Sequence, residues 1–330
     1  MAITTYGDIS PRTAAYVSKD FQKRAMPNLV LELFGQAKPI PKKSSTAVTF
    51  RRYNALSATP KELTEGVTPA STALTKTDMP ATLKQYGDYV EITDIIEDTH
   101  EDPVLQEAVD VLGEQAGEML ERVRFGIVKA GTNVLYANGS ARTAVNTALS
   151  LTLQRKATNL LARQNGKQIT KVVKASPEFG TTPVAASYIG ICHVDLDADI
   201  RALAGFRPIE EYGSHMHVFP GEIGKVEQVR YVASTVFEPW ADAGGAKGLM
   251  RSTSGTSADV YPILYVSKDA YGIVPFKDKN AVKPMVLNPN VPRGGDPLGQ
   301  RGSVGWKALH TAVILNDAWM VRAEVAVVAL

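Results

Sequence analysis

The sequence predicts an α+β protein with one long helix, one extended hairpin and a mixed domain of strands and short helices. A segment at residues 103–138 repeats apolar residues at helical spacing. About 35 residues rich in Thr and Pro separate two segments that alternate like strands. A chain of 330 residues that is 44% hydrophobic can bury the core of two domains, or of one domain with extensions.

The composition excludes several classes of protein. The 36 basic and 34 acidic residues give a net charge of +2, which is not typical of a dedicated nucleic-acid binder. The single cysteine, Cys192, excludes an intramolecular disulfide framework and is typical of synthesis in a reducing cytosol. No apolar run reaches the ~18 residues of a membrane span, and residues 1–20 lack the pattern of a signal peptide.

Residues 1–45 are predicted to form an arm that has no core of its own. A short amphipathic helix fits Pro11–Met26, with Ser10 as its N-cap. Pro27, Pro39 and Pro41 then interrupt the chain. Residues 1–53 carry nine Lys or Arg and three acidic residues, so this end of the chain has a charge of +6 and the remainder −4.

Residues 46–96 are predicted to form an extended hairpin loop. Val48 and Phe50 alternate with polar neighbours, and a second strand fits 89–96. The stretch between them is too long for a loop inside a compact domain, so it is either disordered or a hairpin that packs outside its own domain. The flanking strands favour the hairpin. At ~3.3 Å per residue, ~15 residues in each direction would reach roughly 50 Å.

A long spine helix is predicted over 103–138. Asp102 caps it, Pro103 opens it and Gly139 ends it, and its length would be roughly 50 Å. Its apolar face is predicted to consist of Leu105, Ala108, Leu112, Ala116, Met119, Val123, Ile127, Ala130 and Val134. Glycines inside the helix, such as Gly126 and Gly131, suggest that other backbones pass close by.

The remaining chain alternates strands and helices. A helix fits Leu151–Ala162 and ends at Asn165–Gly166. Strands fit 187–194, 226–236 and 260–266, with a short helix directly after the first of these. A Pro/Gly-rich loop is predicted over 281–302, and a hairpin that turns at Asn316–Asp317 is predicted over 306–330, with a buried final strand.

Three motifs invite a catalytic or ligand-binding interpretation, and each has a simpler one. His215 and His217 would point to the same strand face, as metal ligands must, but no third ligand follows at a familiar spacing. Cys192 and His193 would point to opposite faces of a strand, which is wrong for a nucleophile–base dyad. The Gly-rich loop 294–302 lacks a Walker lysine and a following helix. We therefore predict no catalytic residue, no metal and no cofactor.

Charge clusters leave two interpretations open. Lys42–Lys43 and Arg51–Arg52 could contact DNA phosphates, or they could belong to a solvated arm or form ion pairs with an acidic neighbour, and the sequence favours neither interpretation. Seven acidic residues lie within 91–107, where they suit a helix N-terminus better than catalysis or a structural cation. Attraction between this acidic stretch and the basic arm of a neighbouring subunit would make assembly sensitive to salt.

Several short sequence motifs, in the order in which they occur, resemble those of tailed-bacteriophage major capsid proteins, in the family typified by the podovirus N-four major capsid protein. They are Leu63-Thr-Glu-Gly-Val-Thr-Pro69, Gln85-Tyr-Gly-Asp-Tyr-Val-Glu-Ile-Thr-Asp94, Tyr188-Ile-Gly-Ile-Cys-His-Val-Asp195, Gly221-Glu-Ile-Gly-Lys-Val226 and Val313-Ile-Leu-Asn-Asp-Ala-Trp-Met-Val-Arg322. The order of arm, hairpin, spine helix, mixed domain and returning strands agrees with this resemblance.

The resemblance implies a peripheral domain (97–185 with the spine helix), an axial domain (186–295) and strands at 296–330 that return to the peripheral domain. It implies a shell of pentamers and hexamers around double-stranded DNA, with portal, scaffolding and decoration proteins as further partners and no membrane. The virion capsid would be assembled in the host bacterial cytoplasm, without a fused scaffold segment. The predicted intersubunit contacts are Arg51, Arg52, Leu63, Glu65, Gly66, Val67 and Pro69.

Two other functions remain as alternatives. A bacterial nanocompartment shell would share the fold and enclose enzymes instead of DNA. An oligomeric metal-dependent hydrolase would use His215 and His217, but an enzyme needs polar residues that converge in a pocket, and the sequence does not supply such a set.

Overall fold

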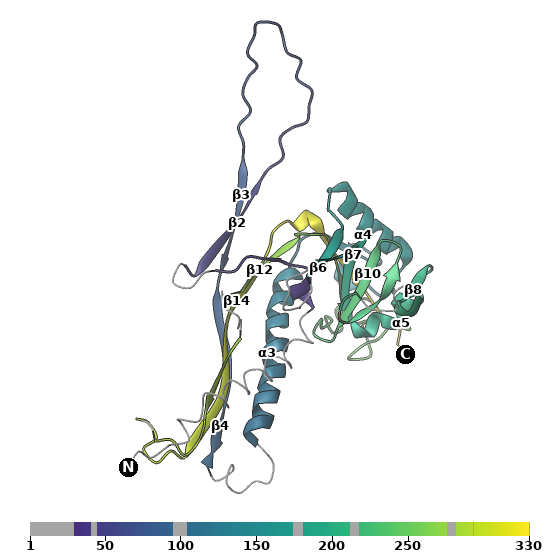
Figure 1. Cartoon of the computed structure of the whole chain (residues 1–330). Helices are drawn as coiled ribbons and strands as arrows, with labels where there is room; N and C mark the ends of the chain where they lie inside the picture. Colours follow the sequence, from purple (N-terminus) through teal and green to yellow (C-terminus); the bar gives the residue numbers. More distant parts are fainter. Residues whose placement is uncertain are drawn as a thin grey trace.

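The computed structural model describes residues 30–40, 45–94, 104–173, 181–211, 218–275, 282–292 and 294–329. Figure 1 shows a narrow hairpin loop, an elongated sheet with the helix α3 beside it, and a rounded unit of strands and short helices. The predicted α+β class is confirmed. The helix predicted at Pro11–Met26 lies outside the described residues.

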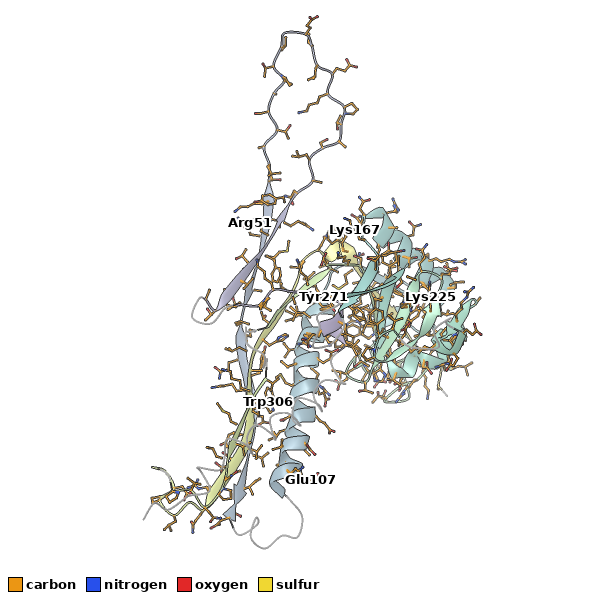
Figure 2. The ribbon with its side chains drawn as sticks, in the orientation of Figure 1. Arg51, Glu107, Lys167, Lys225, Tyr271 and Trp306 are labelled. Carbon is orange, nitrogen blue, oxygen red and sulfur yellow. The ribbon has the colours of Figure 1, made fainter. Side chains whose placement is uncertain are left out.

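The helix α3 runs over Val104–Val128 and packs along the elongated sheet. Val109, Leu112, Ala116 and Leu120 are buried against the sheet, as a helical period of 3.6 requires. Trp306 of the sheet lies between the strands and this helix (Figure 2) and is 4% exposed. The helix therefore gains its stability from one long apolar face.

The predicted end of the spine helix at residue 138 is wrong, because α3 stops at Val128. The residues that follow form β5 (Val134–Tyr136), which pairs in parallel with the distant strand β15 (Met320–Val325). A Cβ at Gly131 would lie 2.8 Å from side-chain atoms of Asp317 and Met320, so glycine permits this crossing. By contrast, a Cβ at Gly126 would meet no described atom within 4 Å, so the described part of the chain gives no packing reason for glycine there.

One long strand organises the elongated sheet. The strands, in spatial order, are β1 (Gln36–Ala37), β12 (Tyr271–Pro275), β14 (Arg301–Ile314) and β13 (Val282–Leu287). The strand β4 (Lys84–Thr93) lies antiparallel along the other edge of β14, with Trp306 opposite Asp88. Residues 282–287, predicted to belong to a loop, therefore form a strand.

The hairpin is built differently from the prediction. Its strands are β2 (Ala47–Tyr53) and β3 (Lys76–Thr82), with Phe50 opposite Met79. The segment predicted as the second hairpin strand, 89–96, instead contributes to β4, which pairs with β14. Phe50 and Ala81 anchor the base of the hairpin in a small core with Ile40, Val274 and Leu315.

The rounded unit contains an eight-stranded sheet. Its spatial order is β5, β15, β11 (Tyr261–Val266), β7 (Thr181–His193), β10 (Val229–Ser234), β9 (Glu222–Val226) and β8 (Phe206–Pro208), with β6 (Ile169–Val173) paired to β7. The helices α4 (Leu151–Arg163) and α5 (Asp197–Arg201) contribute to the core on one face. The other face packs against the C-terminal end of α3 and residues 30–34.

Local signals explain much of this unit. The Ser150 side chain accepts a hydrogen bond from Leu153 N and caps α4, while Asn165 takes a positive φ of 56° after its end. The predicted helix is thus confirmed. The strand predicted over 226–236 is confirmed as β10, and Glu227, at a φ of 51°, forms part of the turn that joins it to the preceding antiparallel strand β9. Short 3-10 helices occupy Leu31–Leu33, Arg142–Ala144, Val194–Leu196, Ile209–Glu211 and Asp317–Trp319.

The chain crosses between the two large sheets more often than the predicted domain boundaries allow. Within 97–185, α3 lies beside the elongated sheet, but β5 and β6 belong to the eight-stranded sheet. Within 186–295, β12 and β13 belong to the elongated sheet. The predicted C-terminal hairpin is also wrong: the chain turns at Asn316–Asp317, but β14 and β15 enter different sheets.

Candidate functional site

The loop between β2 and β3 is a candidate assembly surface. The predicted contact residues at its tip stand clear of the rest of the chain (Figure 1) and are all exposed: Leu63, Glu65, Gly66, Val67 and Pro69. Leu63 is 73% and Val67 63% exposed. A turn with Val67 N bonded to Thr64 O, and with Gly66 at a φ of 78°, presents these side chains. The predicted role of these residues in contacts between subunits stays a prediction.

The two arginines predicted at the base of the hairpin have different surroundings. Arg51 forms an exposed ion pair with Asp78 across the hairpin, with its Nε 2.8 Å from Oδ1. The hydrogen bond that Arg51 donates to the Asp78 carboxylate raises the pKa of Arg51. Arg52 points to the opposite face of β2, the same face as Phe50, and has no carboxylate partner among the described residues. Arg51 is therefore neutralised within its own chain, and Arg52 is not.

A buried polar cluster fixes residues 30–32 against α3. The Glu121 carboxylate, fully buried, accepts hydrogen bonds from the backbone N–H of Val30 and Leu31 at 3.0 and 2.9 Å. Arg124 lies near the other carboxylate oxygen, at 3.6 Å, and donates from Nε to His310 Nε2 at 3.0 Å. Burial raises the pKa of Glu121, although the two backbone N–H groups oppose this shift. The cluster therefore fixes residues 30–32 against the C-terminal half of α3.

A second buried carboxylate holds the C-terminal strand. Glu324, at 0% exposure, accepts hydrogen bonds from Arg142 and Arg322 at 2.8 and 2.9 Å. The guanidinium of Arg142 also stacks 3.6 Å from the ring centre of Trp240. These contacts connect β15 to the segment after β5 and so stabilise the β5 edge of the eight-stranded sheet.

The motifs with a catalytic interpretation do not form an active site among the described residues. Cys192 is buried and burial raises its pKa, so it is a core residue and not a nucleophile. His193 Nδ1 accepts a hydrogen bond from the Asp195 N–H, so Nδ1 carries no proton to donate to the nearby Asp195 carboxylate. This is the wrong tautomer for a catalytic triad.

The structure describes one of the remaining candidate ligand sites and leaves the others outside its range. In the loop 294–302, the Asp296 carboxylate accepts a hydrogen bond from Arg301 N, so an acidic side chain occupies the position that a phosphate would need. No cluster of His, Cys, Asp or Glu with metal-binding geometry occurs in the part of the chain that the structure describes. His215, His217, Lys42–Lys43 and most of the acidic stretch 91–107 lie outside it. Among the described helices, none is long and apolar enough to cross a membrane.

The family model for phage capsid proteins matches residues 76–323, which include the helix α3 and most strands of both large sheets. The chain belongs to the phage capsid protein family. It is a major capsid protein, a structural subunit that assembles into the shell of a tailed phage. Its membership of the narrower N-four type stays a prediction.

Solved capsid structures share the fold of this capsid protein at low sequence identity. The capsid of Ralstonia phage GP4 superposes with a TM-score of 0.64 at 13% identity, covering 89% of this chain and 87% of that one. The capsid subunit of cyanophage Pam1 gives 0.63 at 12% identity over 94% and 93%. The head protein of Helicobacter pylori bacteriophage KHP40 gives 0.59 at 13% identity over 88% and 87%. A comparison with curated proteins finds no match.

Sequence reasoning missed the residues that position the arm of the capsid protein. The predicted face of α3 places Val123 and Ile127 in the core, but both are only partly buried. The buried stripe instead continues from Leu120 to Arg124. A strict step of four residues from Ala116 through Leu120 would have found Arg124, but its partners Glu32 and His310 are distant in sequence.

Proposed function

We propose that this major capsid protein closes an icosahedral shell of pentamers and hexamers, and that residues 54–85 of each subunit rest on a neighbouring subunit. The observation that supports the proposal is the exposed apolar surface of the loop, because Leu63 and Val67 at its tip and Leu74 on its returning limb are each more than 60% exposed in the single chain. A partner that covers them would gain roughly 1.5–3 kcal/mol for each large side chain that becomes fully buried.

The subunit consists of a packed body, formed by α3 and the two large sheets, and an extended hairpin loop. The helix α3 and the elongated sheet form the proposed peripheral domain, and the eight-stranded sheet forms the proposed axial domain near the centre of a capsomer. A stable protein interface buries ~1,600 Å². A subunit that contacts several neighbours would exceed this area, so weak single contacts would still produce a stable closed shell.

Double-stranded DNA, a portal, scaffolding proteins and decoration proteins are the proposed further partners, with assembly in the host cytoplasm. We assign the capsid protein no catalytic activity and no cofactor, since Cys192 and His193 do not form a dyad. A test is His193→Gln, which we expect to leave shell formation intact.

A shortened loop tests the proposed role of residues 54–85. Replacing 57–72 by two glycines retains the strands β2 and β3 and the hydrogen bond from Asn54 N to Thr75 O. We expect a soluble, folded subunit that does not form stable shells, as measured by electron microscopy and sedimentation. Normal shells from this variant would contradict the proposal.

A matched pair of variants tests the chemistry of the loop tip. Leu63→Ser combined with Val67→Ser removes apolar surface, while Thr64→Ser combined with Thr68→Ser changes the same turn with little loss of apolar area. We expect only the first pair to impair assembly. Equal effects of the two pairs would show that the apolar side chains are not the contact.

A further inference from the structure

A cavity of about 310 Å³ lies where the base of the hairpin meets the body of the subunit. This volume is at the lower end of the ~300–1,000 Å³ of ligand pockets, which is enough for one or two protein side chains. The lining comes from β1, β2, β3 and two turns of the body: its main residues are Lys38, Phe50, Arg52, Met79, Asp269 and Trp319. We call it the base cavity.

The base cavity combines an apolar floor with a rim that carries three cationic side chains (Lys38, Arg51 and Arg52) and one carboxylate (Asp269). Phe50, 5% exposed, and Met79 form part of the floor. On the rim, the Lys38 ammonium lies 5.4 Å from the ring centre of Phe50 and donates to Thr49 O. Arg52 lines the cavity as well, and no carboxylate pairs with it among the described residues. An occupant that suits this lining has an apolar side chain next to a carboxylate.

The loop tip has this chemistry. Leu63 and Val67 flank Glu65 in a turn, and Glu62 adds a second carboxylate. Glu62, Leu63, Glu65 and Val67 are all exposed. The tip 62–67 therefore carries two negative charges and two large apolar side chains, which complement a cavity with positive charge and an aromatic floor.

The length and direction of the loop decide which copy supplies the tip. Thirteen residues separate Phe50 from Leu63, and at ~3.3 Å per residue they span roughly 40 Å. Figure 1 shows the tip pointing away from the base of its own hairpin, and the Asn54–Thr75 hydrogen bond holds the two limbs of the loop together. The tip cannot enter its own base cavity in this arrangement, so the occupant is a second copy.

We propose that the loop tip of one capsid subunit inserts Leu63 into the base cavity of the next subunit and places Glu65 beside Arg52 and Lys38. This inference rests on the proposed role of residues 54–85 and names the receptor for the tip. Every subunit then donates one tip and accepts one, in a heterologous contact that continues from subunit to subunit. An occupied base cavity also fixes the angle of the accepting subunit's own hairpin, because both β2 and β3 line it.

Engineered disulfides test the contact in assembled particles. The variant with Leu63→Cys and Met79→Cys should form covalent dimers and longer ladders on mild oxidation, as resolved on a non-reducing gel. Each single variant is a control, and the native Cys192 is buried and does not contribute. A double variant that forms normal shells but stays monomeric on the oxidised gel would overturn the inference.

A charge exchange tests the ionic part independently. We expect Glu65→Arg and Arg52→Glu each to raise the critical concentration for assembly at least fivefold, and the two together to restore it to within about twofold of the original. Lys38→Glu is a second acceptor variant if Arg52→Glu misfolds, and Arg163→Glu, a reversal on the exposed side of α4, is a control. Failure of the paired reversal to restore assembly would overturn the inference.

The two levels of proposal remain distinguishable. If the shortened loop abolishes shells but neither the ladder nor the charge rescue is observed, the loop rests on a neighbour somewhere else, and only the base cavity is ruled out as its receptor. If the shortened loop forms normal shells, both proposals are wrong.

Discussion

Acid should destabilise the folded capsid subunit by protonating one buried histidine. His310 is 2% exposed, and its Nε2 accepts a hydrogen bond from Arg124 Nε, so the imidazole must be neutral. Burial, together with the positive charge of Arg124, lowers the pKa of His310 from its ordinary 6.5 to about 3. Protonation would place a second positive charge against Arg124 inside the core and break this hydrogen bond.

The sign and size of the effect follow from proton linkage. The unfolded chain binds more protons than the native one between the two pKa values, so the stabilisation is complete above pH 6.5 and is lost as the pH falls toward 3. At pH 5, about 1.5 units below the unfolded value, the loss is ~2 kcal/mol at ~1.4 kcal/mol per unit. Glu121 acts in the opposite direction. Because burial raises the pKa of its carboxyl group, the contribution of Glu121 to the stability of the folded subunit falls as the pH rises.

The comparison of wild type with His310→Gln isolates this group. The glutamine oxygen can still accept the hydrogen bond from Arg124 but cannot be protonated. We measure the free energy of unfolding of the unassembled subunit in urea at pH 7 and pH 5. We expect it to fall by ~2 kcal/mol less in the variant than in wild type over this range. His193→Gln, at a partly exposed imidazole, should retain most of the wild-type loss. An equal loss in wild type and His310→Gln would refute the reasoning.

Three further substitutions test the internal contacts. Glu324→Gln should destabilise the subunit by about 3–5 kcal/mol in urea, because Arg142 and Arg322 lose a buried partner; a change below ~1 kcal/mol would contradict this. Trp306→Ala should cost about 3–5 kcal/mol by opening a cavity between α3 and β14, and shells of this variant should melt at lower temperature than wild type. Gly305→Ala would place a Cβ 2.7 Å from Tyr89 Cβ, so the amides of β4 should exchange hydrogen faster; unchanged exchange in β4 would show that the strands accommodate it.

The sequence predicts well where a segment carries its own signal. The helix at 151–163 begins at a serine cap and ends at Asn165–Gly166, and both signals are local. The sequence also predicts the exposed tip of the hairpin, because turn residues and apolar side chains lie next to each other there. In these segments the local preference and the tertiary structure agree.

The failures occur where the partner is far away in the chain. Val134–Tyr136 fits the helical period of the preceding residues, but it becomes a strand because β15, almost two hundred residues later, offers an edge. Glu121 and Arg124 are buried because residues 30–32 and His310 satisfy them. The base cavity draws on five separate segments, so no window of sequence could reveal it.

The position of the last thirty residues has a consequence for the synthesis of the capsid protein. The strand β14 lies between β4 and β12–β13, and β15 lies between β5 and β11, so the C-terminal strands are interior members of both large sheets. Both sheets therefore close only after residues 301–325 have been synthesised. A chain that stopped before Arg301 would lack an interior strand of each large sheet, so neither sheet could form as described.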